Sequence, residues 1–334
     1  MAKRRSSRNG NKIEPSVLTM AFALPDGAAT STIDLSQCAS LLNRRFYRQG
    51  INWAVAGFKV ISPSGATGAL SVAQLPNTWI MSNSWEKSFR AWNKMNRDAI
   101  SEAQSIRPKF LDFKIYADAD HHSAGYGLNL LPVDLLGAPY TAGQWVSAKF
   151  VIPKTNGTDD TISHEIVAVG ANYPGTGASG LNAVSLIEGY AASRALPDIL
   201  DPNTPADADD ADGSTPENWL SALSNDGIDQ DSEVIADLIS ENNLAPYPFE
   251  GDGANVDTMY PGGANQGVGL ELHDRTTMTP TTIGGYTTMK GGIFPASLMR
   301  FDLQAASISG NFVIQVTLAP GPEKGYMSQS LLEV

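Results

Sequence analysis

Cysteine and long apolar runs are both scarce in this chain. Cys38 is the only cysteine among the 334 residues, so neither an internal disulfide nor a cysteine-based metal site can form. No apolar run approaches the roughly 20 residues of a membrane-spanning helix, and we expect no membrane partner. The basic N-terminus is not followed by the apolar segment of a secretory signal. Together these absences predict a soluble protein that is made inside the cell.

The common motifs of hydrolases and nucleotide-binding enzymes are missing as well. The sequence contains no G-x-S-x-G, no G-x-x-x-x-G-K-[ST] and no H-E-x-x-H. Gly175, Gly177 and Gly180 do spell G-x-G-x-x-G. However, the chain then enters an acidic segment where a dinucleotide-binding fold needs a second parallel strand. We interpret the glycines as a plain loop and expect neither enzyme activity nor a cofactor.

Two clusters contain potential metal ligands. They are a D-x-D-H-H run (Asp118, Asp120, His121, His122) and an acidic run (Asp207, Asp209, Asp210, Asp212). Adjacent histidines at the end of a strand point to opposite sides, so both rarely reach one ion. The acidic run fails the EF-hand template, which needs an oxygen ligand at Ala208 and a glutamate at Trp219. We predict no metal site, and weak structural calcium binding by the acidic run stays open.

Positive charge is absent from one long part of the chain and concentrated in another. No Lys or Arg occurs between Arg194 and Arg275, and residues 195–274 hold 18 of the 35 carboxylates. Residues 1–114 carry 16 Lys and Arg against 7 Asp and Glu, although the whole chain has a net charge of −12. This distribution is typical of a protein that faces a polyanion on one side and stays soluble on the other.

Three groups of cations are the candidate nucleic-acid-binding residues. They are an N-terminal arm (Lys3, Arg4, Arg5, Arg8, Lys12), a cluster (Arg44, Arg45, Arg48) and a helical stripe (Lys87, Arg90, Lys94, Arg97). Short cationic segments bind phosphate backbones by Coulomb attraction and counterion release, without reading sequence. The arm is equally compatible with a nuclear-import signal, and the stripe with a solvated helix face.

Turn-forming residues favour a β-rich architecture, because 31 Gly and 20 Pro are spread along the chain. Strand-like segments lie at residues 16–24, 51–61, 68–75, 78–81, 109–119, 144–153, 164–171, 289–303 and 310–320. Eight or nine strands separated by long connections are consistent with a β-sandwich or jelly roll.

One amphipathic helix interrupts the strands. Trp85, Phe89 and Trp92 recur at helical spacing, and Ser82 or Asn83 can cap the N-terminus. The aromatic face is expected to be core, with the cationic stripe on the opposite face. A short helix is also expected just before the Arg44 cluster.

The boundaries follow from composition. Residues 1–13 are predicted to be a flexible basic arm, and residues 14–334 a single domain. Within that domain, residues 195–274 are too acidic and proline-rich to form core, and we interpret them as an outward-facing insertion of loops and short helices.

Several blocks resemble one known family. They are the basic arm, IDLSQCASLLNRRFYRQGINWAVAGFKV, SWEKSFRAWNKM leading into RPKFLDFKIY, and the closing GYMSQSLLEV. These blocks, about half the chain, resemble capsid proteins of small circular Rep-encoding single-stranded DNA (CRESS-DNA) viruses. The resemblance implies a single jelly roll of two four-stranded antiparallel sheets that self-assembles into an icosahedral shell around the genome. It places the protein in the virion, with the host nucleus as a compatible site of assembly.

In that setting the arm would point inward, towards the DNA. A shell of sixty copies would contribute roughly 300 arm charges, against one charge per nucleotide. Because that is too few for a genome of kilobases, the Arg44 cluster or the helical stripe is expected to face inward too. Two alternatives remain open: a capsid protein of a small RNA virus, and a non-viral β-sandwich binding module similar to a lectin or adhesin.

Overall fold

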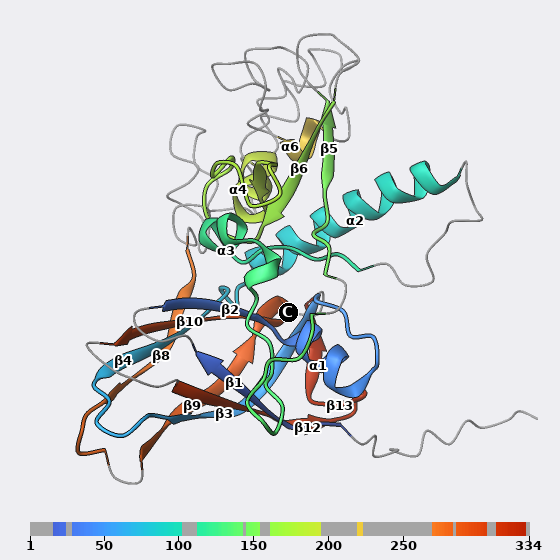
Figure 1. Cartoon of the computed structure of the whole chain (residues 1–334). Coiled ribbons are helices and arrows are strands. Elements are labelled where there is room, and N and C mark those ends of the chain that lie inside the picture. Colours follow the sequence, from blue (N-terminus) through green and yellow to red (C-terminus); the bar gives the residue numbers. More distant parts are fainter. Residues whose placement is uncertain are drawn as a thin grey trace, which may run out of the picture.

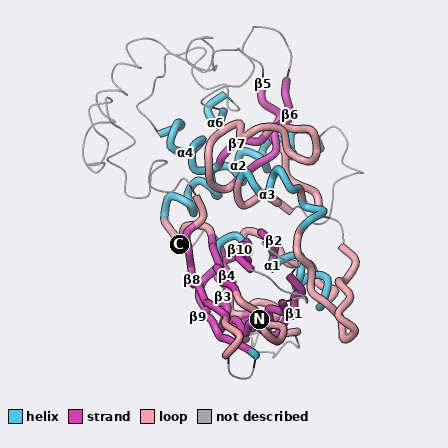
Figure 2. The backbone as a smooth tube through the Cα atoms, turned by 60° about the vertical axis from the view of Figure 1, so that its left-hand side comes forward, coloured by secondary structure: helices cyan, strands magenta, loops and turns pink. Residues whose placement is uncertain are grey.

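Two packed β-sheets form the lower half of the molecule, and a mixed helical and stranded segment lies above them (Figure 1). The computed structural model describes residues 16–24, 29–101, 112–142, 145–153, 161–194, 219–222, 269–282, 285–305 and 312–331. The view in Figure 2 shows the same division, with β5 and β6 at the end opposite to the sandwich strands.

Both sheets of the sandwich are antiparallel. The first contains β1 (Thr19–Leu24), β11 (Phe312–Leu318), β3 (Ile51–Ile61), β14 (Ser328–Ser330) and β9 (Tyr286–Phe294), the last paired with β3. The second runs in the order β2 (Ala29–Asp34), β10 (Leu298–Ala305), β4 (Gly68–Gln74) and β8 (Glu271–Met278). The prediction of a mostly β protein with antiparallel sheets is confirmed.

The sandwich core is built from the inward side chains of both sheets. The strand β11 alternates buried and half-buried residues along FVIQVTL, as expected when one face of a strand is covered. Phe58 of the first sheet contacts Phe301 of the second edge-to-face, with ring centroids 5.9 Å apart. Phe22, Ile314 and Val72 belong to the same buried cluster, so one hydrophobic layer holds the two sheets together.

Everything between the neighbouring strands β4 and β8 is one long insertion. Its described elements are α2 (Trp79–Ser101), α3 (Ala119–Ala124), η2 (Tyr126–Leu128), β5 (Phe150–Pro153), β6 (Thr161–Val167), β7 (Ala183–Ser185), α4 (Leu186–Arg194) and α6 (Trp219–Ala222). β5 pairs antiparallel with β6, which pairs parallel with β7. A second buried cluster that includes Trp85, Phe150 and Trp219 stabilises the insertion and continues into Leu298 of the sandwich.

Four short elements complete the fold. They are α1 (Leu35–Asn43), η5 (Pro295–Ser297), β12 (Pro320–Gly321) and β13 (Gly325–Tyr326). The predicted short helix before the Arg44 cluster is thereby confirmed as α1. The strand-like segments 16–24, 51–61, 68–75 and 310–320 contain β1, β3, β4 and β11, and segment 289–303 contains most of β9 and β10.

Other sequence-based predictions were wrong in their details. Residues 78–81 begin α2 and are not a strand, and Thr78 caps this helix in place of Ser82 or Asn83: the N–H of Met81 donates to Thr78 Oγ1. An apolar run as short as Trp79–Met81 does not distinguish a strand from the first turn of a helix. In the described part of 109–119, Tyr116 forms only an isolated bridge to Val167.

The sheets are also larger and differently placed than predicted. The first sheet has five strands, and the insertion adds a three-stranded sheet to the expected two four-stranded sheets. Segment 144–153 forms a strand only at Phe150–Pro153, and segment 164–171 contributes to β6, which ends at Val167. The strands β2 and β8 were missed. β8 begins at Glu271, so the last residues of the predicted acidic insertion are sheet.

Candidate nucleic-acid interface

The basic arm joins the fold beside the C-terminal end of α1. The arm cations lie outside the described residues, but the first described residues are tied down. Ser16 Oγ donates to the Gly325 carbonyl at 3.2 Å, and the Val17 N–H donates to Asn43 Oδ1 at 3.0 Å. Tyr326 Oη donates to the Val17 carbonyl at 2.7 Å. Val17, the second described residue after the arm, therefore contacts Asn43, which directly precedes Arg44.

The helix α1 positions the Arg44 cluster. Asp34 caps its N-terminus, and Arg44 is its C-cap in the left-handed conformation, with φ 53° and ψ 39°. Left-handed backbone at this position ends a helix and turns the chain sharply away. Arg44 and Arg48 are exposed and Arg45 is half-buried. The three cations thus lie in one loop directly after α1.

Buried hydrogen bonds hold this loop in place. The N–H of Tyr47 donates to Ser40 Oγ at 3.1 Å, and Tyr47 Oη donates to the Lys324 carbonyl at 3.0 Å. Gln49 exchanges two hydrogen bonds with the backbone of Ile115, at 3.0 Å and 2.7 Å. Because Tyr47 and Gln49 on either side of Arg48 are buried and hydrogen-bonded, they hold the cationic loop in one conformation.

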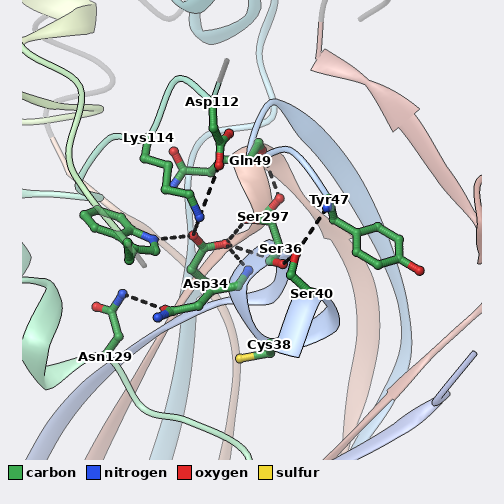
Figure 3. Close-up of polar contacts among 12 residues, drawn as sticks. Asp34, Ser36, Cys38, Ser40, Tyr47, Gln49, Asp112, Lys114, Asn129 and Ser297 are labelled. Carbon is green, nitrogen blue, oxygen red and sulfur yellow. Dashed lines mark hydrogen bonds and ion pairs between the residues drawn. The ribbon is translucent and has the colours of Figure 1, made fainter. Parts of the chain in front are cut away.

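The carboxylate of Asp34 is the centre of the network below the loop (Figure 3). Its Oδ1 accepts from the N–H groups of Ser36 at 2.8 Å and Gln37 at 3.2 Å, as a helix cap does. Its Oδ2 accepts from Trp145 Nε1 at 2.7 Å and lies 3.8 Å from Lys114 Nζ. Asp34 is fully buried, so these donors are needed to offset the loss of water.

Two neighbouring titratable groups complete that network. Burial raises the pKa of the Asp112 carboxyl, although Lys114 Nζ lies 3.2 Å away and acts in the other direction. Burial also raises the pKa of the Cys38 thiol well above its usual value. A thiol of this kind stays protonated at neutral pH and is a poor nucleophile.

Lys324 is a cation of this surface that sequence reasoning missed. Its Nζ donates to the Phe46 carbonyl at 2.8 Å and lies 5.4 Å from the centroid of the Tyr47 ring. It lies in the turn between β12 and β13, far from Arg44 in sequence. No local pattern links the two positions, so only the tertiary structure could bring Lys324 to the cluster.

The helical stripe is a separate surface. All four of its cations are exposed, whereas Trp85 and Trp92 of the same helix are buried, as the spacing predicted. Arg90 pairs with Glu86, and Lys87 Nζ lies 5.9 Å from the centroid of the Tyr190 ring.

Within the described part of the chain, neither Lys94 nor Arg97 has an ion-pair partner. Arg48 lines a hollow of about 420 Å³ together with Trp85 and Phe89. The Arg44 cluster therefore borders the aromatic side of α2, and the stripe occupies the solvent side. The structure places Val17, which follows the arm, beside the Arg44 cluster, and the stripe is a separate surface.

The D-x-D-H-H residues serve the fold. Asp118 caps α3 by accepting from the His121 N–H at 2.9 Å. Arg300 pairs with Asp118 and Asp120, at 2.5 Å and 2.9 Å. No group of three or more potential ligands is arranged to hold a metal in the regions that the structure describes. The acidic run Asp207–Asp212 lies outside those regions.

Both histidines of that run are buried and hydrogen-bonded. His121 accepts the Ala117 N–H on Nδ1 at 3.0 Å, and its Nε2 lies 2.7 Å from Asn129 Oδ1. Burial lowers the pKa of His121. His122 Nε2 lies 2.9 Å from Glu165 Oε2. The two rings therefore face different partners, as adjacent positions predicted, although they lie on a helix and not on a strand.

The glycine motif forms a loop, in agreement with its interpretation. Gly175 and Gly180 have positive φ of 106° and 83°, and the chain passes from this loop into β7 without an intervening helix. A Cβ on Gly177 would lie 2.4 Å from His122 Nε2. These glycines allow close packing against a buried ring, and the helix N-terminus that binds a pyrophosphate is missing there.

Comparisons with protein-family models, with curated sequences and with solved structures gave no match. Among the described helices, none combines the length and the apolar character needed to span a bilayer. The function is therefore inferred from the chain's own residues.

Proposed function

We propose that this chain is a jelly-roll capsid protein that self-assembles into a closed shell and packages a nucleic acid, most simply single-stranded DNA. Nested strand pairing supports the jelly roll. Of the eight main sandwich strands, the first pairs with the last (β1 with β11), the second with the seventh (β2 with β10), the third with the sixth (β3 with β9) and the fourth with the fifth (β4 with β8). Two sheets with this nesting are the architecture of many viral coat domains.

The observation that carries the proposal is the place where the arm joins the fold. Val17 contacts Asn43, and the next residue begins the Arg44 cluster, to which Lys324 adds another cation. The four described cations Arg44, Arg45, Arg48 and Lys324 thus lie next to Val17, the second described residue after the arm. Such a surface binds phosphate backbones without reading base sequence, as a coat protein must.

The nucleic acid is assigned as DNA on the resemblance of the arm and of the blocks around residues 33–60 and 84–116 to CRESS-DNA virus capsids. The cationic surface itself would bind RNA in the same way, since phosphate contacts do not involve the 2′-OH. The cargo of recombinant particles distinguishes the two nucleic acids.

The test is electron microscopy of the purified recombinant chain, combined with nuclease protection and sequencing of the protected nucleic acid. We expect closed particles of uniform size that hold protected nucleic acid. A chain that stays monomeric and binds no polyanion at low salt would contradict the proposal.

A matched pair of variants locates the binding surface. R44Q/R45Q/R48Q should lower the amount of protected nucleic acid per particle, because it removes three cations next to the arm. The control K59Q/K290Q removes two exposed cations from the neighbouring strands β3 and β9 and should keep the cargo. Equal loss in both variants would show that the binding is not localised to the Arg44 cluster.

A further inference from the structure

One stretch of the insertion is almost free of charge. Between Asp120 and Lys149 the only formally charged residue is Asp134, apart from the two buried histidines. Large apolar side chains are exposed along this stretch: Tyr126, Leu128, Leu135, Leu136, Tyr140 and Val146. Exposed apolar groups without charged neighbours mark interaction surfaces, because the cores of protein interfaces are depleted of charge and enriched in such residues.

This stretch closes the open side of the sandwich (Figure 1). The Leu130 N–H donates to the Thr32 carbonyl of β2, and the Val133 N–H donates to the Ala21 carbonyl of β1, both at 2.8 Å. β1 and β2 are the edge strands of their sheets on this side. Because residues 130–133 cover these strand edges, a partner protein cannot add a strand there by backbone pairing. It would instead contact the exposed side chains of this stretch.

The apolar tip of this stretch, residues 133–140, is a preformed turn. Asp134 Oδ1 accepts from the N–H groups of Leu136 at 2.8 Å and Ala138 at 2.9 Å. Gly137 has a φ of 80°, which the turn requires and a larger residue tolerates poorly. Leu135 is fully exposed and Leu136 is 92% exposed. Because the turn already fixes the backbone of both exposed leucines, their burial by a partner would cost little backbone conformational entropy.

We propose that the 133–140 turn is a contact between copies of this chain, with Leu135 and Leu136 buried against a second copy. The inference rests on the proposed self-assembly and names a surface that carries it. Two copies with a net charge of −12 each repel one another. Association is therefore easiest where the surface is uncharged, and the one charge of this turn is already bonded to two of its own N–H groups.

The test compares the native chain with L135S/L136S by sedimentation velocity and electron microscopy. We expect the double variant to weaken self-association by at least about tenfold, since two exposed anchors are lost from the interface. Thermal unfolding of the subunit and its affinity for single-stranded DNA should be unchanged, because both side chains are exposed, lie outside the core and carry no charge. The control variant S64A changes an exposed residue of the loop between β3 and β4 and should assemble normally.

A thiol placed at the tip gives a second readout that does not depend on disrupting assembly. Cys38 is buried and is the only native cysteine, so L136C and the control S64C each carry one accessible thiol. In assembled particles the thiol at position 136 should react with a maleimide at least about tenfold more slowly than in free subunits. The thiol at position 64 should serve as the exposed reference.

The outcomes separate this inference from the proposed function. Particles that form normally with L135S/L136S, or a fully reactive thiol at position 136 in particles, would overturn the turn contact and leave the capsid proposal intact. A native chain that neither associates nor protects nucleic acid would overturn both. Binding of the native chain to phosphatidylcholine vesicles that L135S/L136S abolishes, without self-association, would assign the leucines to a membrane and overturn the contact.

Discussion

At the residue scale, buried polar side chains determine how the cationic surface is held. Asp34 connects the N-terminus of α1 to Trp145 and Lys114 of the insertion. Glu165 has a similar role within the insertion, where it accepts from Ser147 and Ser179 and contacts His122. Burial acts to raise the pKa of Glu165, but these three hydrogen bonds outweigh it and lower that pKa. Such groups are strongly coupled to the fold, because a lost partner leaves a buried charge unpaired.

The first prediction concerns Asp34. D34A should lower the free energy of unfolding by about 3 kcal/mol, since it removes a helix cap, leaves Trp145 Nε1 without its acceptor and leaves Lys114 paired with Asp112 but not with Asp34. S36A removes only a hydroxyl near the same carboxylate and should cost about 1 kcal/mol. Urea unfolding of the subunit measures both. Equal losses in the two variants would show that the carboxylate is not the centre of this network.

The second prediction concerns the pH dependence of stability. Burial lowers the pKa of His121 and of His164 from the usual 6.5. The unfolded chain therefore binds more protons than the folded one just below pH 6.5, and stability should fall as the pH drops through that range. A proton on His121 Nδ1 would also remove its acceptor for the Ala117 N–H.

The measurement is the free energy of unfolding between pH 7.5 and pH 5. H121Q should be less stable than the native chain at pH 7.5, with a shallower decline towards pH 5, because one of the two titrating rings is gone. An unchanged decline would show that His121 does not carry this linkage.

At the scale of the elements, the end of α1 is where the proposed binding role of Arg44 meets a structural one. Arg44 has a positive φ, which costs an ordinary side chain about 1 kcal/mol. Arg44 thus occupies a helix-ending position at which glycine or asparagine is the usual residue. The proposed binding role would explain why an arginine occupies a backbone conformation that favours glycine. Residues that oppose the local backbone preference are expected at functional or strained sites.

The third prediction separates those two roles. R44G should raise the free energy of unfolding by about 0.5 kcal/mol, since glycine adopts this backbone without strain, while lowering the affinity for single-stranded DNA. R45G also removes one cation, but Arg45 is not among the residues with positive φ, so it should destabilise the chain. Urea unfolding and oligonucleotide binding are measured on both. A destabilised R44G would contradict the argument from strain.

At the scale of the whole molecule, β1, the first described strand after the arm, begins at the end of the sandwich from which the insertion departs. The strands β1 and β3 begin at this end, and β2 and β4 end there. α1 follows β2 at this end, and the insertion follows β4. The opposite end carries four short connections, between β1 and β2, β3 and β4, β8 and β9, and β10 and β11. The charged functions of this protein are therefore expected at one end, and assembly contacts along its sides.

The fourth prediction measures how many cations engage the nucleic acid. Binding of oligo(dT) should weaken linearly with the logarithm of salt concentration, with a slope near −0.7 for each neutralised phosphate of a single strand. Removing residues 1–13 should reduce the slope by about 3.5, and R44Q/R45Q/R48Q by about 2. K59Q/K290Q is the control and should keep the native slope. A slope unaffected by the arm deletion would exclude the arm from binding.

The sequence by itself determined the local features of this protein. The mostly β class, the short helix before Arg44, the amphipathic face of α2 and the charge segregation all follow from residue type and spacing, which act over a few residues. The segment 78–81 shows the limit of such reasoning, because the three apolar residues after Thr78 fit a strand or a helix start equally well until Thr78 is recognised as a cap.

Only the tertiary structure decided which distant residues meet. Lys324 and Val17 lie beside the end of α1 because β13 returns to it. Asp34 pairs with Lys114 of an insertion that no local pattern delimits. The strand β2 was missed because its sequence, ATSTID, is small and polar and becomes buried only through its pairing with β10. Long-range pairing depends on the whole chain closing its core, and that information is not contained in any short window of sequence.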